Sequence, residues 1–198
     1  YEHFDTNKSC IRIPDDFIPR LNSNDILTTS NPEVIIENKR RAEMVITFKG
    51  ADDQYVKTMN NFTNLTVELD TKNVDQSIQD AKKQIAKIRS SNKKLKLIYV
   101  GNLPFGGDEE KIWMEILKLL CEAGFDEIHL IIAAKSLPGQ SKEHKAKKYA
   151  RYFEGLYAIH FIRPEQFDDI TTPTVQIVIK KGYDGPVKVY DEFRLLYS

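Results

Sequence analysis

The sequence predicts an α/β fold with a mostly parallel sheet and an antiparallel edge near its carboxyl-terminal end. Short apolar runs of strand type alternate with helical patterns of roughly ten to fifteen residues, which is typical of parallel strands joined by crossover helices. The final two strand patterns, at 174–180 and 187–190, have no helix between them. A parallel connection needs such a crossover, so these two strands predict the antiparallel edge.

The composition is that of an ordinary globular chain. Its 198 residues suffice for one domain, or one domain with an appendage, and 41% hydrophobic with 29% charged residues argue against disorder. The 29 basic residues balance the 29 acidic ones, so contact with nucleic acid would need a local basic patch rather than a global field. No apolar run approaches the length of a membrane-spanning helix, and we expect no membrane contact.

Cysteine content and the first residue indicate location and processing. Two cysteines, Cys10 and Cys121, are too few for a disulfide framework or a metal cluster. We therefore predict no metal site and a reducing, cytoplasmic setting. Tyr1 is not an initiator residue, so we expect the amino terminus to be trimmed or processed.

The amino-terminal third is predicted to hold an irregular arm followed by two strands. Residues 1–32 scatter a few apolar side chains among Asp, Asn and Pro, which indicates an arm packed on a domain that spans 33–198. Apolar runs predict strands at 42–48 and 65–70, with a short helix at 52–60 between them.

The remaining elements follow from apolar periodicity and helix-end signals. Asn73 is a typical helix cap, and apolar residues at spacings of four and three then predict one face of an amphipathic helix: Val74, Ile78, Ala81, Ile85 and Ile88. Further helices are predicted at 108–123, stopped by Gly124, and at 141–154; further strands are predicted at 95–100, 127–134, 156–162, 174–180 and 187–190, with a hairpin-like turn at 182–186.

The stretch around Asn102 holds the residues most suggestive of chemistry. An apolar strand pattern at 95–100 ends at Gly101, and Asn102, Leu103, Pro104 and Phe105 follow directly. An amide, a rigid proline and an aromatic ring would then stand at the carboxyl end of a buried strand, where open α/β sheets bind ligands. The alternative is a strand followed by an ordinary turn, because Asn, Pro and Gly are common turn residues.

This stretch resembles a known motif. Residues 100–105 are similar to the (Asn/Asp)-Pro-Pro-(Tyr/Phe) motif of adenine-specific amino-methyltransferases, and the Leu103 form looks like the Asn-Leu-Pro-(Tyr/Phe) variant of ribosomal RNA adenine dimethyltransferases. The likeness continues in order and spacing through 112–120, 128–138 and 167–179. It implies a Rossmann-like methyltransferase sheet, S-adenosylmethionine as cofactor, and a restriction–modification role on nucleic acid, with DNA ahead of RNA and with a partner subunit.

The resemblance also implies a chemical role for each motif residue. The lone pair of adenine's exocyclic amine is delocalised into the ring, so the amine is a poor nucleophile. The side-chain oxygen of Asn102 and the backbone carbonyl of Leu103 would accept hydrogen bonds from this amine and direct its lone pair toward the methyl donor. Pro104 would keep these acceptors preorganised. Phe105 would stack on a base extruded from the helix.

The cofactor half of the resemblance is weaker. Such enzymes place a Gly-rich turn after the first strand and an acid after the second. Phe48 and Gly50 would supply the turn, and Glu68 or Asp70 would bind the ribose hydroxyls. Only one glycine is present, and the interval from Asp70 to Asn102 is short for a third strand. The cofactor site is therefore either atypical or lost.

A basic run supplies the predicted nucleic-acid contact. This run consists of Lys142, Lys145, Lys147, Lys148 and Arg151. Its side chains could bind the phosphates of a nucleic-acid backbone, or they could form the solvated face of a helix.

Two further functions stay open. One is a non-catalytic, methyltransferase-like subunit of a modification complex. The other is an RNA-recognition-motif module, because residues 97–105 also resemble the first signature strand of that family, with Tyr99 as a base-stacking ring on an open sheet. The second signature is not matched by its nearest stretch, residues 148–155.

Overall fold

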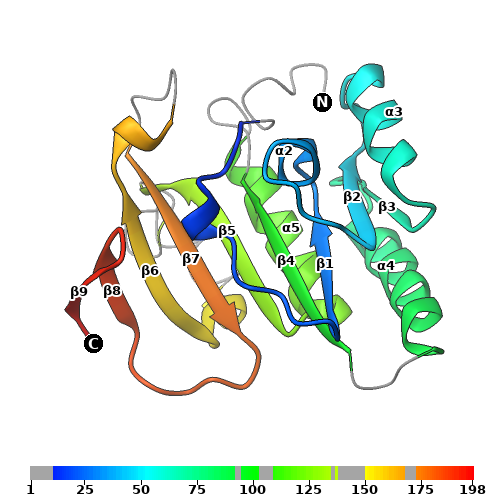
Figure 1. Cartoon of the computed structure of the whole chain (residues 1–198). Helices are drawn as coiled ribbons and strands as arrows, with labels where there is room; N and C mark the ends of the chain where they lie inside the picture. Colours follow the sequence, from blue (N-terminus) through cyan, green and yellow to red (C-terminus); the bar gives the residue numbers. More distant parts are fainter. Residues whose placement is uncertain (1–10, 92–94, 103–108, 135–136, 138–149, 168–172) are drawn as a thin grey trace.

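The computed structural model of the chain describes residues 11–91, 95–102, 109–134, 137, 150–167 and 173–198. Within this part, one mixed sheet of nine strands has the order β3-β2-β1-β4-β5-β7-β6-β8-β9 (Figure 1). The strands are β1 (Asp25–Thr29), β2 (Met44–Phe48), β3 (Thr66–Leu69), β4 (Lys96–Asn102), β5 (Glu127–Ala133), β6 (Leu156–Ile162), β7 (Thr174–Lys180), β8 (Lys188–Asp191) and β9 (Arg194–Tyr197). The helices are η1 (Asp15–Phe17), α2 (Pro32–Ile36), α3 (Asp53–Phe62), α4 (Val74–Arg89), α5 (Glu109–Ala123), η3 (Ala150–Phe153) and η4 (Pro164–Gln166).

The first five strands form the parallel part of the sheet. Each of the pairs β2–β3, β1–β2, β1–β4 and β4–β5 is parallel. The order β3-β2-β1-β4-β5 is that of a doubly wound sheet, which grows outward in both directions from its first strand. The mostly parallel sheet predicted from the alternation of strands and helices is therefore confirmed.

The carboxyl-terminal strands depart from this pattern. β7 lies antiparallel between β5 and β6, β8 is parallel to β6, and β9 is antiparallel to β8. The predicted antiparallel edge is confirmed, but the hairpin at 182–186 is wrong. β6 separates β7 from β8, so the segment after Lys180 crosses to a new position in the sheet instead of turning back (Figure 1). β9, a short strand of four exposed residues, was not predicted either.

The central strand of the parallel part of the sheet, β1, was not predicted at all. β1 pairs with both β2 and β4, and four of its five residues are buried. It holds only two apolar residues, because Thr28 and Thr29 fill its carboxyl half with β-branched polar side chains. Residues 25–29 therefore belong to the sheet, which corrects the expected boundary between arm and domain at residue 32.

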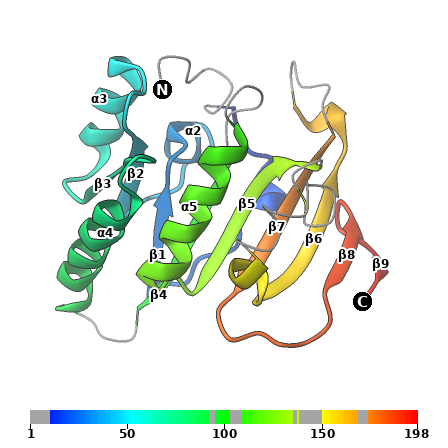
Figure 2. The ribbon, with the colours of Figure 1, turned by 180° about the vertical axis from the view of Figure 1, so that it is seen from behind.

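Residues 11–24 pack on one face of the sheet, and two main-chain carbonyls hold them there. Asn38 Nδ2 donates to the Ile13 carbonyl at 2.6 Å, and Gln176 Nε2 of β7 donates to the Phe17 carbonyl at 2.7 Å. On the opposite face, α4 and α5 pack side by side (Figure 2). The predicted cap is present, since the Asn73 side chain accepts from the Gln76 N–H. Within the described residues, no helix is both long and apolar enough to cross a bilayer.

Candidate functional site

The candidate site lies at the switch point of the sheet, between β1 and β4. The chain leaves β1 toward β2 on one side and leaves β4 toward β5 on the other, and ligands of doubly wound sheets bind in the crevice outside the carboxyl ends of two such strands. Asn102 is the last residue of β4, and Ser30 and Asn31 directly follow β1. The predicted catalytic Asn102 therefore lies at the expected edge.

Asn31 is the residue that closes this crevice. Its side chain is fully buried, and Nδ2 donates to Asn102 Oδ1 at 2.7 Å and to the Ile11 carbonyl at 2.8 Å. Its Oδ1 accepts from the Glu33 N–H at 2.9 Å, which caps α2, and Pro32 occupies the first helical position. One amide thus joins β1, β4, α2 and the amino-terminal segment.

Two tyrosine hydroxyls contact Ser30, the residue before Asn31. The Tyr99 hydroxyl contacts Ser30 Oγ, and the Tyr55 hydroxyl donates to the Ser30 carbonyl at 2.6 Å. Tyr99 has no exposed surface, and burial raises the pKa of its phenol. A base-stacking role for Tyr99 on an open sheet is therefore wrong: its ring is buried, and β4 has a parallel neighbour on each side.

Gly101 keeps the space that the Tyr99 ring occupies. A Cβ at this position would lie 2.5 Å from the Tyr99 hydroxyl oxygen and 2.9 Å from the ring carbon that bears it. We expect Gly101→Ala to displace this hydroxyl from Ser30 and to lower the free energy of unfolding by about 1–3 kcal/mol, which is typical of overpacking. Urea unfolding of the variant and of the wild type measures this. A loss smaller than about 1 kcal/mol in Gly101→Ala would contradict the packing argument.

The residues predicted to bind the cofactor lie one strand further along than expected. Because β1 is the first strand, Phe48 and Gly50 belong to the second strand and its turn, while Glu68 and Asp70 belong to the third. The turn after the first strand is Ser30-Asn31-Pro32, which has no glycine. The residue directly after the second strand is Lys49 instead of an acid. The short interval between Asp70 and Asn102 needs no further strand, because β3 is itself the third.

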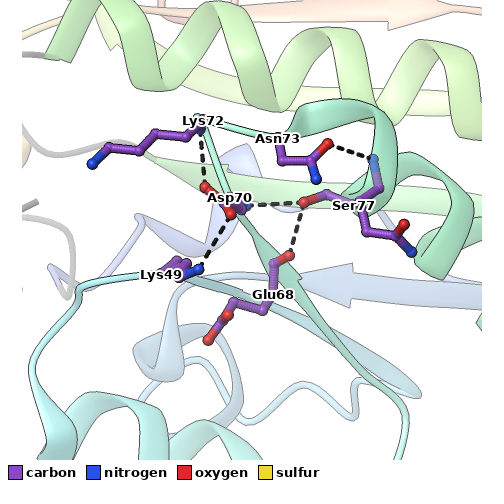
Figure 3. Close-up of polar contacts among 7 residues, drawn as sticks. Lys49, Glu68, Asp70, Lys72, Asn73 and Ser77 are labelled. Atoms are coloured by element: carbon purple, nitrogen blue, oxygen red, sulfur yellow. Dashed lines mark hydrogen bonds and ion pairs between the residues drawn. The ribbon is translucent and has the colours of Figure 1, made fainter.

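The two predicted acids are engaged differently (Figure 3). Asp70 Oδ2 accepts from Lys49 Nζ at 3.3 Å, and Oδ1 accepts from the Lys72 N–H at 2.9 Å. The hydrogen bond from Lys72 and then the ammonium of Lys49 lower the pKa of Asp70. The Glu68 side chain is exposed. The main-chain carbonyl of Glu68, rather than its carboxylate, accepts from Ser77 Oγ at 3.0 Å. Asp70 thus serves the turn between β3 and α4.

The residues after β1 and β2 do not fit S-adenosylmethionine at the position that the methyltransferase resemblance implies for it. A glycine turn lets the main chain approach a cofactor, but here Ser30 and Asn31 carry side chains that are buried and hydrogen-bonded within the protein. Ribose hydroxyls that donate need an acceptor at the end of the second strand, and Lys49 has donors only. The crevice is closed by the chain's own polar groups.

Most remaining site predictions lie outside the described residues. These are Leu103, Pro104, Phe105, Lys142, Lys145, Lys147 and Lys148. Arg151 is described: it lies in η3, exposed, and its Nη2 donates to Glu122 Oε1 at 3.0 Å. Among the described residues, no three histidine, cysteine, aspartate or glutamate side chains gather as a metal site.

Comparison with known proteins gives similarity in structure only. No protein-family model and no curated protein matches the chain. A chain of a type I R-M system, solved in work on the complex assembly and conformational transition of that system, aligns with 90% of this chain and 43% of its own length, at a TM-score of 0.51 and 12% identity. A candidate DNA modification methyltransferase encoded within an E. coli prophage aligns with 80% and 47%, at a TM-score of 0.45 and 13% identity. A candidate class I S-adenosylmethionine-dependent methyltransferase from Listeria monocytogenes aligns with 90% and 62%, at a TM-score of 0.46 and 8% identity.

These similarities concern the fold. At such identities, the match to the type I R-M chain together with the strand order confirms the predicted fold class, a mostly parallel, Rossmann-like α/β sheet with an antiparallel carboxyl-terminal edge. This chain spans 43%, 47% and 62% of the lengths of the three proteins.

Proposed function

We propose that this chain is a methyltransferase-like subunit of a nucleic-acid modification complex, which contacts adenine but does not itself bind S-adenosylmethionine. The observation that carries the proposal is the closed turn after β1. Ser30 is 2% exposed and Asn31 is fully buried, and both are hydrogen-bonded where a doubly wound sheet admits its cofactor. A similar fold within a type I R-M system supports membership of such a complex.

Asn102 remains suited to an adenine amine. A carbonyl oxygen has two lone pairs, and Asn31 uses one of those on Oδ1. The second has no donor among the described residues, and the bond from Asn31 holds the oxygen in a fixed direction. Because Asn102 is only 3% exposed, an incoming base would reach this oxygen only if the surrounding chain moved aside. Asn102 is proposed as this acceptor, with Leu103, Pro104 and Phe105 in the roles that the resemblance implies.

The second candidate is catalysis: methyl transfer from S-adenosylmethionine to the exocyclic amine of adenine in DNA or RNA. The position of Asn102 at the carboxyl end of β4 favours it, since a preorganised acceptor there would stabilise developing charge on the amine. The closed turn after β1 and Lys49 after β2 favour the non-catalytic subunit.

Calorimetry and oligonucleotide binding separate the two candidates. We expect no heat on titration with S-adenosylmethionine. We also expect an adenine-containing oligonucleotide to bind more tightly than one in which purine, which lacks the amine, replaces adenine. Asn102→Ala should abolish this preference, whereas Asn60→Ala, at an exposed position of α3, should retain it. Micromolar binding of the cofactor would contradict the proposal, and transfer of a radiolabelled methyl group to nucleic acid would establish the enzyme.

A further inference from the structure

A charged cleft lies at the amino-terminal ends of β4 and β5, on the opposite side of the sheet from the end of β4 that carries Asn102. It occupies about 620 Å³ where α4 ends, β4 and β5 begin and β7 ends. The antiparallel register sets Glu127 beside Lys180 there. Six charged residues line the cleft: Arg89, Lys96, Asp126, Glu127, Lys180 and Lys181.

Among the described residues, the lining carries an excess of positive charge. Four of the six charged residues are basic and two are acidic, which leaves a net charge of +2. Both acids are already engaged. Glu127 accepts from Lys96 Nζ at 2.5 Å and contacts His129 Nε2 at 3.1 Å, and Asp126 Oδ2 accepts from the Leu97 N–H at 2.8 Å.

Of the other three basic residues, Arg89 is paired with Asp126, at 3.8 Å between Arg89 Nη2 and Asp126 Oδ2. Within the described part of the chain, neither Lys180 nor Lys181 forms an ion pair, and Lys180 Nζ lies 3.8 Å from the centre of the Tyr157 ring. Lys188 Nζ lies 4.6 Å from the same ring centre, which brings a further ammonium group to this edge. Arg89 Nε is buried with no acceptor among the described residues, although Nη2 of the same guanidinium contacts Asp126.

We propose that this cleft binds backbone phosphates of a nucleic acid, without regard to base sequence. Lys and Arg side chains are the usual partners of phosphate oxygens, and such contacts position a nucleic acid without reading it. Among the described residues, the ammonium groups that no carboxylate neutralises belong to Lys180 and Lys181, at the end of β7, and to Lys188, at the start of β8, so they suit an extended polyanion better than a single small anion. The inference goes beyond the proposed function, because it requires neither a cofactor nor a base at Asn102.

A matched pair of double variants tests the cleft. Lys180→Gln/Lys181→Gln removes two positive charges from the cleft, and Lys82→Gln/Lys83→Gln removes two from exposed positions of α4. Binding of fluorescent single-stranded and duplex oligonucleotides is measured by anisotropy across a salt series. We expect the cleft variant to bind about tenfold more weakly at low salt, and the slope of log K against log salt to become shallower by about 1–2. The α4 variant should stay within about twofold of wild type, with an unchanged slope.

Several outcomes would overturn the inference. These are equal losses in the two variants, a wild-type slope in the cleft variant, a wild type that binds no oligonucleotide, or stronger binding to anionic lipid vesicles than to oligonucleotide. Competition by pyrophosphate as effective, phosphate for phosphate, as competition by unlabelled oligonucleotide would also overturn it, because it would indicate a small-anion site. Asn102→Ala distinguishes this inference from the proposed function: loss of adenine preference with an unchanged salt slope concerns the base contact alone.

Discussion

Asn31→Ala is expected to lower the free energy of unfolding by about 3 kcal/mol, because one buried amide serves three partners. Loss of the cap on α2 accounts for about 1 kcal/mol. Asn102 Oδ1 and the Ile11 carbonyl each lose a donor, and each buried acceptor left without one costs about 1 kcal/mol or more. Urea unfolding followed by circular dichroism measures the sum.

Two variants separate the parts of this effect. Asn31→Asp keeps the acceptor for the Glu33 N–H but points a carboxylate at Asn102 Oδ1, so it should destabilise at least as much as the alanine. Asn73→Ala removes another Asn cap, which is exposed and makes one long bond of 3.4 Å, and should cost about 0.5–1 kcal/mol. Equal losses at the two caps would show that the bonds across the crevice contribute nothing.

The second large effect is the acid sensitivity conferred by Glu127. Its side chain is 10% exposed, and hydrogen bonds from His129 and then Lys96 lower the pKa of this carboxyl from 4.5 to about 2. Because the folded pKa lies below the unfolded one, the stabilisation is fully present above about pH 4.5 and is lost as the pH falls toward 2. It amounts to roughly 2–3 kcal/mol by linkage.

Glu127→Gln tests this dependence directly. The variant cannot ionise at this position, so its free energy of unfolding should lie below that of wild type at pH 6, and the two should converge between pH 4.5 and 2. Glu154→Gln, at an exposed position, is the control and should follow the wild-type curve. Parallel loss of stability in wild type and Glu127→Gln over this range would rule out the proposed role of the carboxylate.

Elements with strong periodicity or long apolar runs were predictable from the sequence. α4 follows its predicted face, and β6 and β7 match their predicted bounds, because burial of a repeating apolar pattern dictates local structure. β1 escaped because its carboxyl half is Thr28-Thr29, and threonines carry no apolar signal even when buried. Because β1 was not predicted, each residue predicted to bind the cofactor was assigned to a strand one earlier in the chain than the strand to which it belongs.

Some residues of the candidate site could likewise be predicted from the sequence, and others could not. Asn102 could be found because it ends an apolar strand and begins a recognisable motif. Asn31 had a local signal, an Asn before a Pro at a helix start, but nothing in the sequence says that its amide meets a residue 71 positions away. The cleft could not be predicted either, since Arg89, Lys96 and Lys181 belong to separate elements.

By itself, the sequence determined the strand–helix alternation, the place of Asn102 at a strand end and the absence of a second glycine near Gly50. These are local properties, set by apolar periodicity and backbone preference over a few residues. Only the tertiary structure decided which strand comes first, that Asn31 closes the crevice, and that basic side chains gather at the opposite edge. Those outcomes depend on strand order and on hydrogen bonds between distant segments, which form only when the whole sheet is assembled.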